Sequence, residues 1–291
     1  MSQSGTPDRT MLPEPPLPAP LVIAPRRDSP LVLSVPHSGR DCPDWLARLA
    51  DGGRAAVLAL ADPYVDRLVA GLVEAGHGAV VARAPRAALD LNRAPGERVP
   101  ALHPGAPPPP PGSKAANGLG IVIARGPGGR ALWRAPLAPE ALEQRLASGW
   151  TPYYAALGAM LAQVRARHGI AVLLDCHSMP PRQRGLQRVV LGDRDGTSAA
   201  PFLVDAARRA VAGAGLEAGI NHPYAGGEIA RRHGRPAHGI HALQLEVDRS
   251  LYLDRALRRP GPGMARARRL IERVVAALEG ALRERAARAA E

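Results

Sequence analysis

The sequence predicts an α/β protein of three layers, in which a mostly parallel, mixed sheet lies between two layers of helices. Short aliphatic runs recur along the 291 residues, and amphipathic segments of helical length separate them. Strands that are apolar on both faces are typical of a parallel sheet covered on both sides. Aromatic residues make up only 3% of the chain and hydrophobic residues 46%, so aliphatic side chains must fill the core.

Seven apolar runs are predicted to be strands, because they are short and bounded by proline, glycine or polar residues. They lie at residues 21–24, 31–35, 79–82, 120–124, 170–176, 187–191 and 241–247. We expect the first two to be buried strands of the sheet.

Five segments with helical periodicity are predicted to be helices. They lie at residues 62–76, 139–147, 152–167, 199–212 and 264–290. The first opens at Asp62, and Pro63 takes a plausible first helical position. The last has a leucine or valine at every fourth position from Leu270 to Leu282, which predicts one packed face and one solvated basic face.

The chain is predicted to hold a single α/β domain at residues 21–291, preceded by a disordered tail at residues 1–20. The tail is polar and rich in proline, and such a composition cannot bury enough apolar surface to offset the entropy lost on ordering. A second proline-rich segment, at residues 103–118, is expected to form an exposed loop.

The formal net charge of +12 raises the alternative of a basic nucleic-acid-associated protein. Residues 255–291 contain ten arginines and four glutamates, so half of the excess lies in the C-terminal segment. Because the rest is spread thinly, we expect no dedicated nucleic-acid surface. A steep fall of binding with ionic strength would favour this alternative.

The two cysteines, Cys42 and Cys176, form neither a metal-binding pair nor a disulfide framework. The N-terminus lacks the basic-then-apolar order of a signal peptide, and no apolar run approaches the roughly 18 residues of a membrane helix. We therefore expect a cytoplasmic protein without a membrane partner. Nothing in the sequence predicts an oligomeric state.

Polar residues follow or end several of the predicted strands. His37 follows the strand at 31–35, and His177 follows the strand at 170–176. Asp62 starts the predicted helix at 62–76. In open α/β sheets, ligands bind beyond the carboxyl ends of the strands. These three side chains are therefore candidate ligands of a hydrolytic zinc ion. Taken singly, either histidine could be a hydrogen-bonded core or surface residue, and Asp62 could be a helix N-cap.

Further side chains are candidates for catalysis and substrate binding. Glu246 is a carboxylate in an otherwise apolar strand, where it can serve as a general base or pair with an arginine such as Arg249. Arg86 and Arg93 offer guanidinium groups that grip carboxylates, with Asn92 beside them. This cluster would suit an acidic substrate.

A glycine-containing loop completes the candidate set. The sequence NHPYAGG at residues 221–227 begins with Asn221, supplies the hydroxyl of Tyr224, and ends on Gly226 and Gly227. Paired glycines allow close approach of the backbone to a ligand. By itself this pattern is also that of an ordinary turn.

Seven ordered blocks of the sequence resemble the N-formylglutamate amidohydrolase family. The blocks are VPHSG at 35–39, DPYVDRL at 62–68, RAALDLNR at 86–93, LLDCHSMP at 173–180, LGDR at 191–194, NHPYAGG at 221–227 and HGIHALQLEVDRSLYLD at 238–254. The resemblance implies a fold related to the zinc-dependent exopeptidases. It also implies hydrolysis of N-formyl-L-glutamate to formate and glutamate, a step of bacterial histidine degradation.

The resemblance assigns roles to four residues of this sequence. His37, Asp62 and His177 match metal positions, and Glu246 matches the catalytic carboxylate. Zn²⁺ is the implied metal, although the same ligands are compatible with another divalent ion. The implied substrate is a small acidic N-acyl amino acid. A third alternative keeps this fold but only binds acidic metabolites without catalysis.

Three positions depart from the family pattern. Arg40 stands where related peptidases carry an acidic metal ligand three residues after the first histidine. The pair Tyr153-Tyr154 stands where the family has tyrosine and histidine, and Asp248 stands where asparagine is frequent. The first bears on the metal, because an arginine cannot bind zinc and the acidic ligand must come from elsewhere in the chain. The other two bear on substrate choice more than on the metal.

Overall fold

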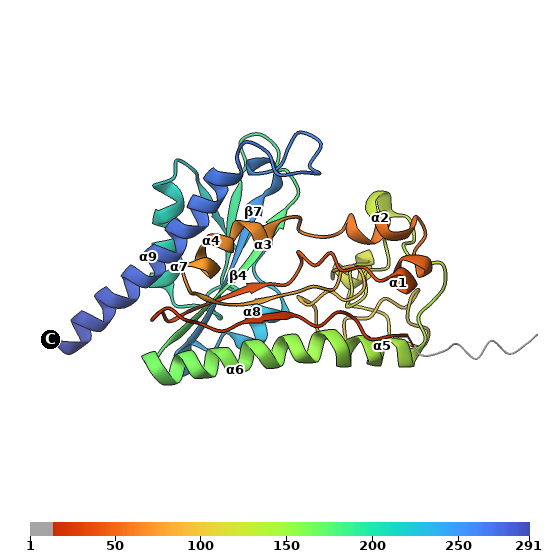
Figure 1. Ribbon diagram of the computed structural model, residues 1–291, viewed down its shortest axis with the longest axis horizontal. Helices are drawn as coiled ribbons and strands as arrows, with labels where there is room; N and C mark the ends of the chain where they lie inside the picture. The colour runs from red at the N-terminus through yellow and green to blue at the C-terminus, as the bar shows by residue number, and fades with distance from the viewer. Residues whose placement is uncertain (1–13) are drawn as a thin grey trace, which may run out of the picture.

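A seven-stranded mixed sheet forms the centre of the computed structural model, which describes residues 14–291 (Figure 1). The strand order is β1-β3-β2-β4-β7-β5-β6, with β1 antiparallel to β3, β5 antiparallel to β7, and the other pairs parallel. The strands are β1 Leu21–Ile23, β2 Leu31–Val35, β3 Gly78–Val81, β4 Ala171–Met179, β5 Val189–Gly192, β6 Ala218–Ile220 and β7 Ile240–Asp248.

Helices cover both faces of this sheet, which confirms the predicted three-layer α/β/α fold. The long helix α6 (Thr151–His168) packs on one face, and α7 (Pro201–Ala212) and α9 (Met264–Ala290) pack on the other (Figure 1). Alternate residues of the central strands enter the two cores: Leu173 faces α6, whereas Val172 and Leu174 face α7 and α9. These strands are therefore apolar on both faces.

Shorter helices complete both layers. They are α1 Asp44–Leu49, α2 Gly53–Leu58, α3 Val65–Leu68, α4 Ala70–Glu74, α5 Pro139–Arg145 and α8 Glu228–His233. Helix α5 continues through a π-helical turn, Leu146–Trp150, directly into α6, so the two helices predicted there are one continuous stretch. Helices α1, α2 and α8 and strand β6 had no counterpart in the prediction.

The predicted helix at 62–76 is wrong in its start and its continuity. The backbone N–H of Asp62 donates to the carbonyl of His37 at 2.9 Å, and Tyr64 is left-handed with φ of 62°, so the helix begins only at Val65. It breaks after Leu68 into α3 and α4. Asp62 is therefore not the helix N-cap.

The predicted strand at 120–124 is also wrong, although the segment is buried. Ile121 donates its N–H to the carbonyl of Glu97 at 2.7 Å, and Ile123 donates to Ala87 at 3.2 Å. These partners belong to the loop at 86–97, so the segment packs beneath that loop and does not join the sheet. Strand β1 is formed as predicted, but the expectation that it is buried is wrong, because it lies at an edge of the sheet, where Leu21 and Val22 are half exposed.

Residues 14–20, predicted as part of a loose tail, pack against α5 and the turn that follows it. Leu17 is buried and its N–H donates to Ser148 Oγ at 3.1 Å. Both carboxylate oxygens of Glu14 accept hydrogen bonds from the buried guanidinium of Arg145, at 2.7 and 2.9 Å. The tail boundary predicted at residue 20 is therefore too late. Residues 1–13 lie outside the described part of the chain.

The C-terminal helix α9 buries the stripe that its spacing predicts. Leu270, Val274, Leu278 and Leu282 face the sheet, whereas Arg269 and Arg273 are exposed. Of the helices in the described part of the chain, none combines the length and the apolar character that crossing a membrane requires.

A buried polar cluster fixes α9 to the sheet and carries a stability prediction. Glu279 accepts hydrogen bonds from Ser29 at 2.6 Å and from His77 at 3.2 Å. Burial raises the pKa of Glu279, but these bonds and the charge of Arg27 outweigh it and lower the pKa. The carboxylate therefore stabilises the fold above its unfolded pKa, and this contribution is lost as pH falls through its folded pKa.

Replacing Glu279 by glutamine is expected to lower the free energy of unfolding at pH 7 by about 1.5–3 kcal/mol, the usual range for hydrogen bonds to a charged group. Urea unfolding at pH 7 and at pH 4 measures it, and the difference between wild type and variant should shrink at the lower pH. Glu284→Gln, an exposed position on the same helix, is the control. An equal effect at both pH values would contradict the ionic origin.

Candidate metal centre and active site

Polar side chains occupy the carboxyl-terminal half of one sheet face, the face that α6 covers. On β4 they are Asp175 and His177, and on the adjacent β7 they are Gln244 and Glu246, in register as the pairs Asp175–Gln244 and His177–Glu246. Successive side chains alternate between faces, so residues two apart share one face. Both strands run further than predicted, and His177 lies within β4 and not after it.

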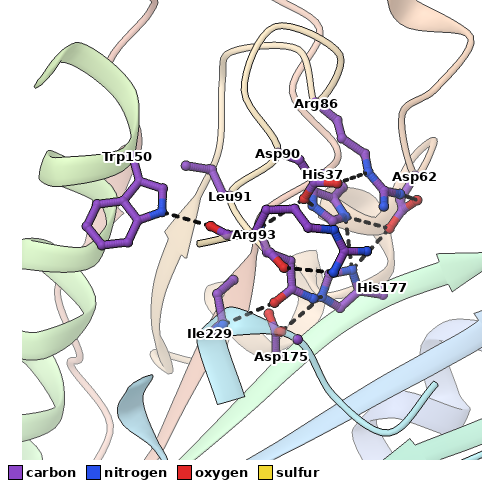
Figure 2. A network of polar contacts seen from close by, with 12 residues as sticks. His37, Asp62, Arg86, Asp90, Leu91, Arg93, Trp150, Asp175, His177 and Ile229 are labelled. Carbon is purple, nitrogen blue, oxygen red and sulfur yellow. Dashed lines mark hydrogen bonds and ion pairs between the residues drawn. The ribbon is translucent and has the colours of Figure 1, made fainter. Parts of the chain in front are cut away.

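Three of the predicted ligand atoms converge at this end of the sheet. Nδ1 of His177 lies 3.1 Å from Nδ1 of His37 and 3.2 Å from Oδ2 of Asp62, and the remaining pair is 3.4 Å apart (Figure 2). All three residues are buried. The structure thus brings together residues that are 25 and 115 positions apart in the sequence.

This arrangement fits a tetrahedral metal ion. Bonds of about 2.0 Å from a tetrahedral zinc place its ligand atoms about 3.3 Å apart, which matches the three measured separations. Each imidazole presents its other nitrogen to a carboxylate: His37 Nε2 donates to Asp90 at 2.7 Å and His177 Nε2 donates to Asp175 at 2.9 Å. Such carboxylate partners are typical of metal-ligating histidines.

The two facing nitrogens also require a positive charge between them. With both Nε2 atoms donating to carboxylates, two neutral imidazoles would direct lone pairs at each other across 3.1 Å. Burial lowers the pKa of His177, but Asp175, Asp62 and Glu246 outweigh it and hold the pKa well above its usual value. In the metal-free protein a proton between the two Nδ1 atoms can supply this charge, and a metal ion bound there would have to displace it.

Two arginines fix the third ligand candidate. Asp62 Oδ1 accepts hydrogen bonds from Arg249 at 2.9 Å and Arg86 at 3.3 Å, which leaves Oδ2 directed at the two histidines. Burial raises the pKa of Asp62, but hydrogen bonds from the histidines and the charge of Arg86 hold the pKa well below its usual range. The alternative pairing predicted for Arg249 was with Glu246, but its partner is Asp62.

Glu246 lies beside this cluster on the neighbouring strand, with one carboxylate oxygen held by Gln244 Nε2 at 2.9 Å. Burial raises the pKa of Glu246 to about 7, Asp62 adds to the increase, and His177 and Arg86 oppose it. A carboxylate with a pKa near neutrality can accept and return a proton at physiological pH.

A cavity of about 340 Å³ opens onto Glu246 and both histidines. Its size lies within the range of about 300–1,000 Å³ that is usual for small-molecule sites. The predicted catalytic residue Arg86 lines it, as do the predicted substrate-binding residues Asn92, Arg93, Tyr224, Gly226 and Gly227. Asn221 does not line it, because its side-chain amide is bonded to Asp193 at 2.7 and 3.0 Å. Asn221 therefore holds the loop against Asp193 and lies outside the cavity lining.

A sequence profile described as N-formylglutamate amidohydrolase matches residues 29–253. The chain belongs to the N-formylglutamate amidohydrolase family. It is 34% identical over 234 residues to an N-formylglutamate deformylase of Pseudomonas aeruginosa and 31% identical over 239 residues to one of Pseudomonas putida. Each match covers 77% of this chain and 82% of the relative.

A solved structure of the N-formylglutamate amidohydrolase from Ralstonia eutropha JMP134 has a similar fold. The TM-score is 0.81 at 29% sequence identity, and the match covers 91% of this chain and 99% of that one. The predicted membership of the family is therefore confirmed.

Two of the three departures noted in the sequence have structural explanations. Arg40 pairs with Asp66 at 2.6 Å near the surface, away from the histidines. Asp248 is buried and accepts hydrogen bonds from the N–H groups of Ser250 and Arg182, so it caps the turn after β7. Neither residue lines the cavity.

The third departure, the tyrosine pair, contacts residues that hold the site of this N-formylglutamate amidohydrolase family member in place. Tyr153 contacts the hydroxyl of Ser34 at 2.9 Å, and Ser34 donates to Asp175 at 2.7 Å, so this chain of contacts ends on His177. Tyr154 donates to the carbonyl of Leu91 at 2.7 Å.

The loop at 86–93 is held in place by further groups that the sequence analysis missed. Trp150 Nε1 donates to the Arg93 carbonyl at 3.1 Å and stacks on Tyr154 at 4.0 Å between ring centroids. Asn92 donates to Gln244 at 3.1 Å and accepts from the N–H of Ile229 at 3.1 Å, so its amide joins the loop to β7 and α8. Its role is thus largely to fix the loop.

The sequence does contain a pattern from which two further residues of the site, Asp175 and Gln244, could be predicted. Asp175 and Gln244 lie two positions before His177 and Glu246, and the alternation of strand side chains puts each on the same face as its neighbour. Gly226 and Gly227 both line the cavity, and Gly227 also packs against Asn92, where a Cβ would collide with the side-chain amide.

Replacing Tyr154 by phenylalanine is expected to lower kcat by about 10- to 100-fold, because the freed Leu91 carbonyl lets Asn92 and Arg93 shift from their positions. Bound metal should stay at the wild-type level. Steady-state kinetics and metal analysis measure the two effects. Tyr64→Phe, which removes a hydroxyl that donates to Arg258 at the surface, is the control. An unchanged kcat would contradict a positioning role.

Proposed function

We propose that this chain is a zinc-dependent amidohydrolase that removes the formyl group from N-formyl-L-glutamate or a related N-acyl amino acid. The observation that carries the proposal is the convergence of three ligand atoms within 3.4 Å, with Glu246 beside them on the same cavity. The names of the similar proteins support the formamide as the bond and glutamate as the amino acid.

His37, Asp62 and His177 would hold the metal, and the cavity would leave its fourth position open. A bound zinc ion supplies Lewis acidity, which polarises a carbonyl and lowers the pKa of a water molecule to about 7. Asp90 and Asp175 keep the Nε2 proton on each imidazole, so that Nδ1 is the free ligand atom.

Glu246 would move the protons of the reaction. As a carboxylate, it takes a proton from the attacking water while the water oxygen bonds to the formyl carbon. It then gives this proton to the departing nitrogen as the C–N bond breaks. The products are formate and the free amine. Gln244, which donates to Glu246 at 2.9 Å, fixes the carboxylate for both transfers.

Arg86 and Arg93 would orient the substrate. Arg86 lines the cavity and is anchored by Asp62 and Asp90, so its charge is fixed near the reacting carbonyl, where it can stabilise the developing oxyanion. Arg93 also lines the cavity, and its buried Nε has no hydrogen-bond partner among the described residues. The guanidinium of Arg93 suits the α-carboxylate of an amino acid, because guanidinium groups bind carboxylates through paired N–H donors.

The test is an assay of formate and free amine with a panel of N-formyl and N-acetyl amino acids, before and after metal removal by a chelator. Activity should disappear on chelation and return when zinc is added. Full activity after thorough removal of metal would contradict zinc dependence. Tight binding of N-formylglutamate without any formate release would instead favour the inactive metabolite binder.

A further inference from the structure

Four cationic side chains line the cavity, and they differ in what they are free to bind. Arg86 and Arg249 both donate to Asp62, and Arg86 also donates to Asp90. Arg93 Nε lies 3.9 Å from Glu97 Oε2 and is buried without a hydrogen-bond partner among the described residues. Lys114 has no acidic partner within 4.0 Å among the described residues. The cavity therefore presents two cations beyond those that hold Asp62.

Lys114 differs from the three arginines in its place in the sequence and in its exposure. It is the only lysine of the chain, and it lies at the end of the proline-rich loop, directly before the short turn Ala115–Asn117. Its side chain is exposed, whereas the arginines are largely buried. Nζ stands 5.8 Å from the ring centroid of Tyr224. Lys114 thus reaches the cavity from its rim.

We propose that Lys114 binds the side-chain carboxylate of the substrate and so sets a preference for acidic N-formyl amino acids. This inference rests on the proposed function. A dicarboxylate that places its α-carboxylate on Arg93 must find a second cation for its other end. Lys114 is the cation of the cavity wall that has no acidic partner within residues 14–291.

The chemistry of the rim fits this role. A lysine ammonium is a compact charge with three donors on a flexible stem, so it can follow a carboxylate at the end of a mobile side chain. Leu60, Leu119 and Ile123 line the same cavity and offer apolar contacts to the methylene groups between the two carboxylates. A neutral amide side chain would meet the ammonium without balancing its charge.

The experiment compares kcat/KM for N-formylglutamate with that for N-formylglutamine, its neutral isostere, in wild type and in Lys114→Met. The preference for the acid should fall by at least about 10-fold in Lys114→Met, as expected when a charge-assisted hydrogen bond is lost. Lys114→Arg should restore part of the preference. Arg130→Met removes one exposed charge that does not line the cavity, and its preference should equal that of wild type.

A direct binding measurement gives a second readout. In the Glu246→Gln background, calorimetry should show the same loss of preference between the two ligands when Lys114 is replaced by methionine. An unchanged preference in an active Lys114→Met enzyme overturns the role of Lys114 and leaves the proposed function standing. A wild type that releases formate from no N-formyl amino acid overturns the proposed function, and this inference with it.

Discussion

Replacing His177 by alanine is expected to abolish both zinc binding and formate release. The variant loses the Nδ1 atom that lies 3.1 Å from His37 Nδ1 and 3.2 Å from Asp62 Oδ2, so two converging atoms remain. Loss of a group that only supports a ligand costs about 10–100-fold in metal affinity, and loss of the ligand itself should cost more than that. Metal analysis after dialysis and a formate assay measure the two effects.

A control variant separates the loss of a ligand from the loss of any buried imidazole. His241 is 5% exposed and lies near the start of β7, at the opposite end of the strand from Glu246. His241→Ala should keep zinc and turnover, although it creates a similar cavity. Asp175→Asn should bind zinc about 10–100-fold more weakly, because His177 loses its carboxylate partner. Wild-type zinc content in His177→Ala would remove His177 from the proposed site.

The central sheet could be predicted because its inner strands are apolar on both faces. The run at 31–35 is β2, and the runs at 170–176 and 241–247 lie within β4 and β7. Hydrophobic periodicity reports burial but not the hydrogen-bond partner, and for that reason the buried run at 120–124 was mistaken for a strand. The edge position of β1 likewise depends on which strands pair, which its composition does not specify.

The residues of the candidate site that lie at strand ends could be predicted. The positions of residues that depend on the path of a loop could not. His37, His177 and Glu246 belong to the ends of sheet strands, and parallel strands bring such ends together. The position of Asp62 depends on a backbone hydrogen bond to His37, and the position of Lys114 depends on the path of a proline-rich loop. Long-range contacts of this kind leave no periodic signal in the sequence.

Replacing Glu246 by glutamine is expected to lower kcat by at least about 100-fold while zinc remains bound, since general acid–base groups contribute about 10²–10⁴-fold. Glutamine keeps the size of the side chain and an oxygen that can accept from Gln244, but it cannot take a proton. In the wild type, the pKa of Glu246 is raised to about 7 by burial, so kcat/KM should fall as pH drops through the titration of this carboxyl. A bound metal dication would stabilise the ionised carboxylate and so move this fall in kcat/KM to lower pH.

The same variant should make the metal-free protein more stable at pH 8. The pKa of Glu246 is about 7 in the folded protein and about 4.5 for an unburied glutamate, so the folded state retains the proton between these values. The free energy of unfolding therefore falls as pH rises from about 4.5 to about 7, and the full penalty persists above that range. At pH 8, the free energy of unfolding of Glu246→Gln should exceed that of wild type by about 3 kcal/mol in urea unfolding, and at pH 4 the difference should be small.

This opposite movement of stability and activity distinguishes a functional carboxylate from a structural one. The structural carboxylate Glu279 has a lowered pKa, so its replacement by glutamine should cost stability at neutral pH, whereas the replacement of Glu246 should increase it. A buried charge that destabilises the fold persists where the reaction requires it. A Glu246→Gln protein that is both fully active and no more stable than wild type at pH 8 would remove Glu246 from the reaction.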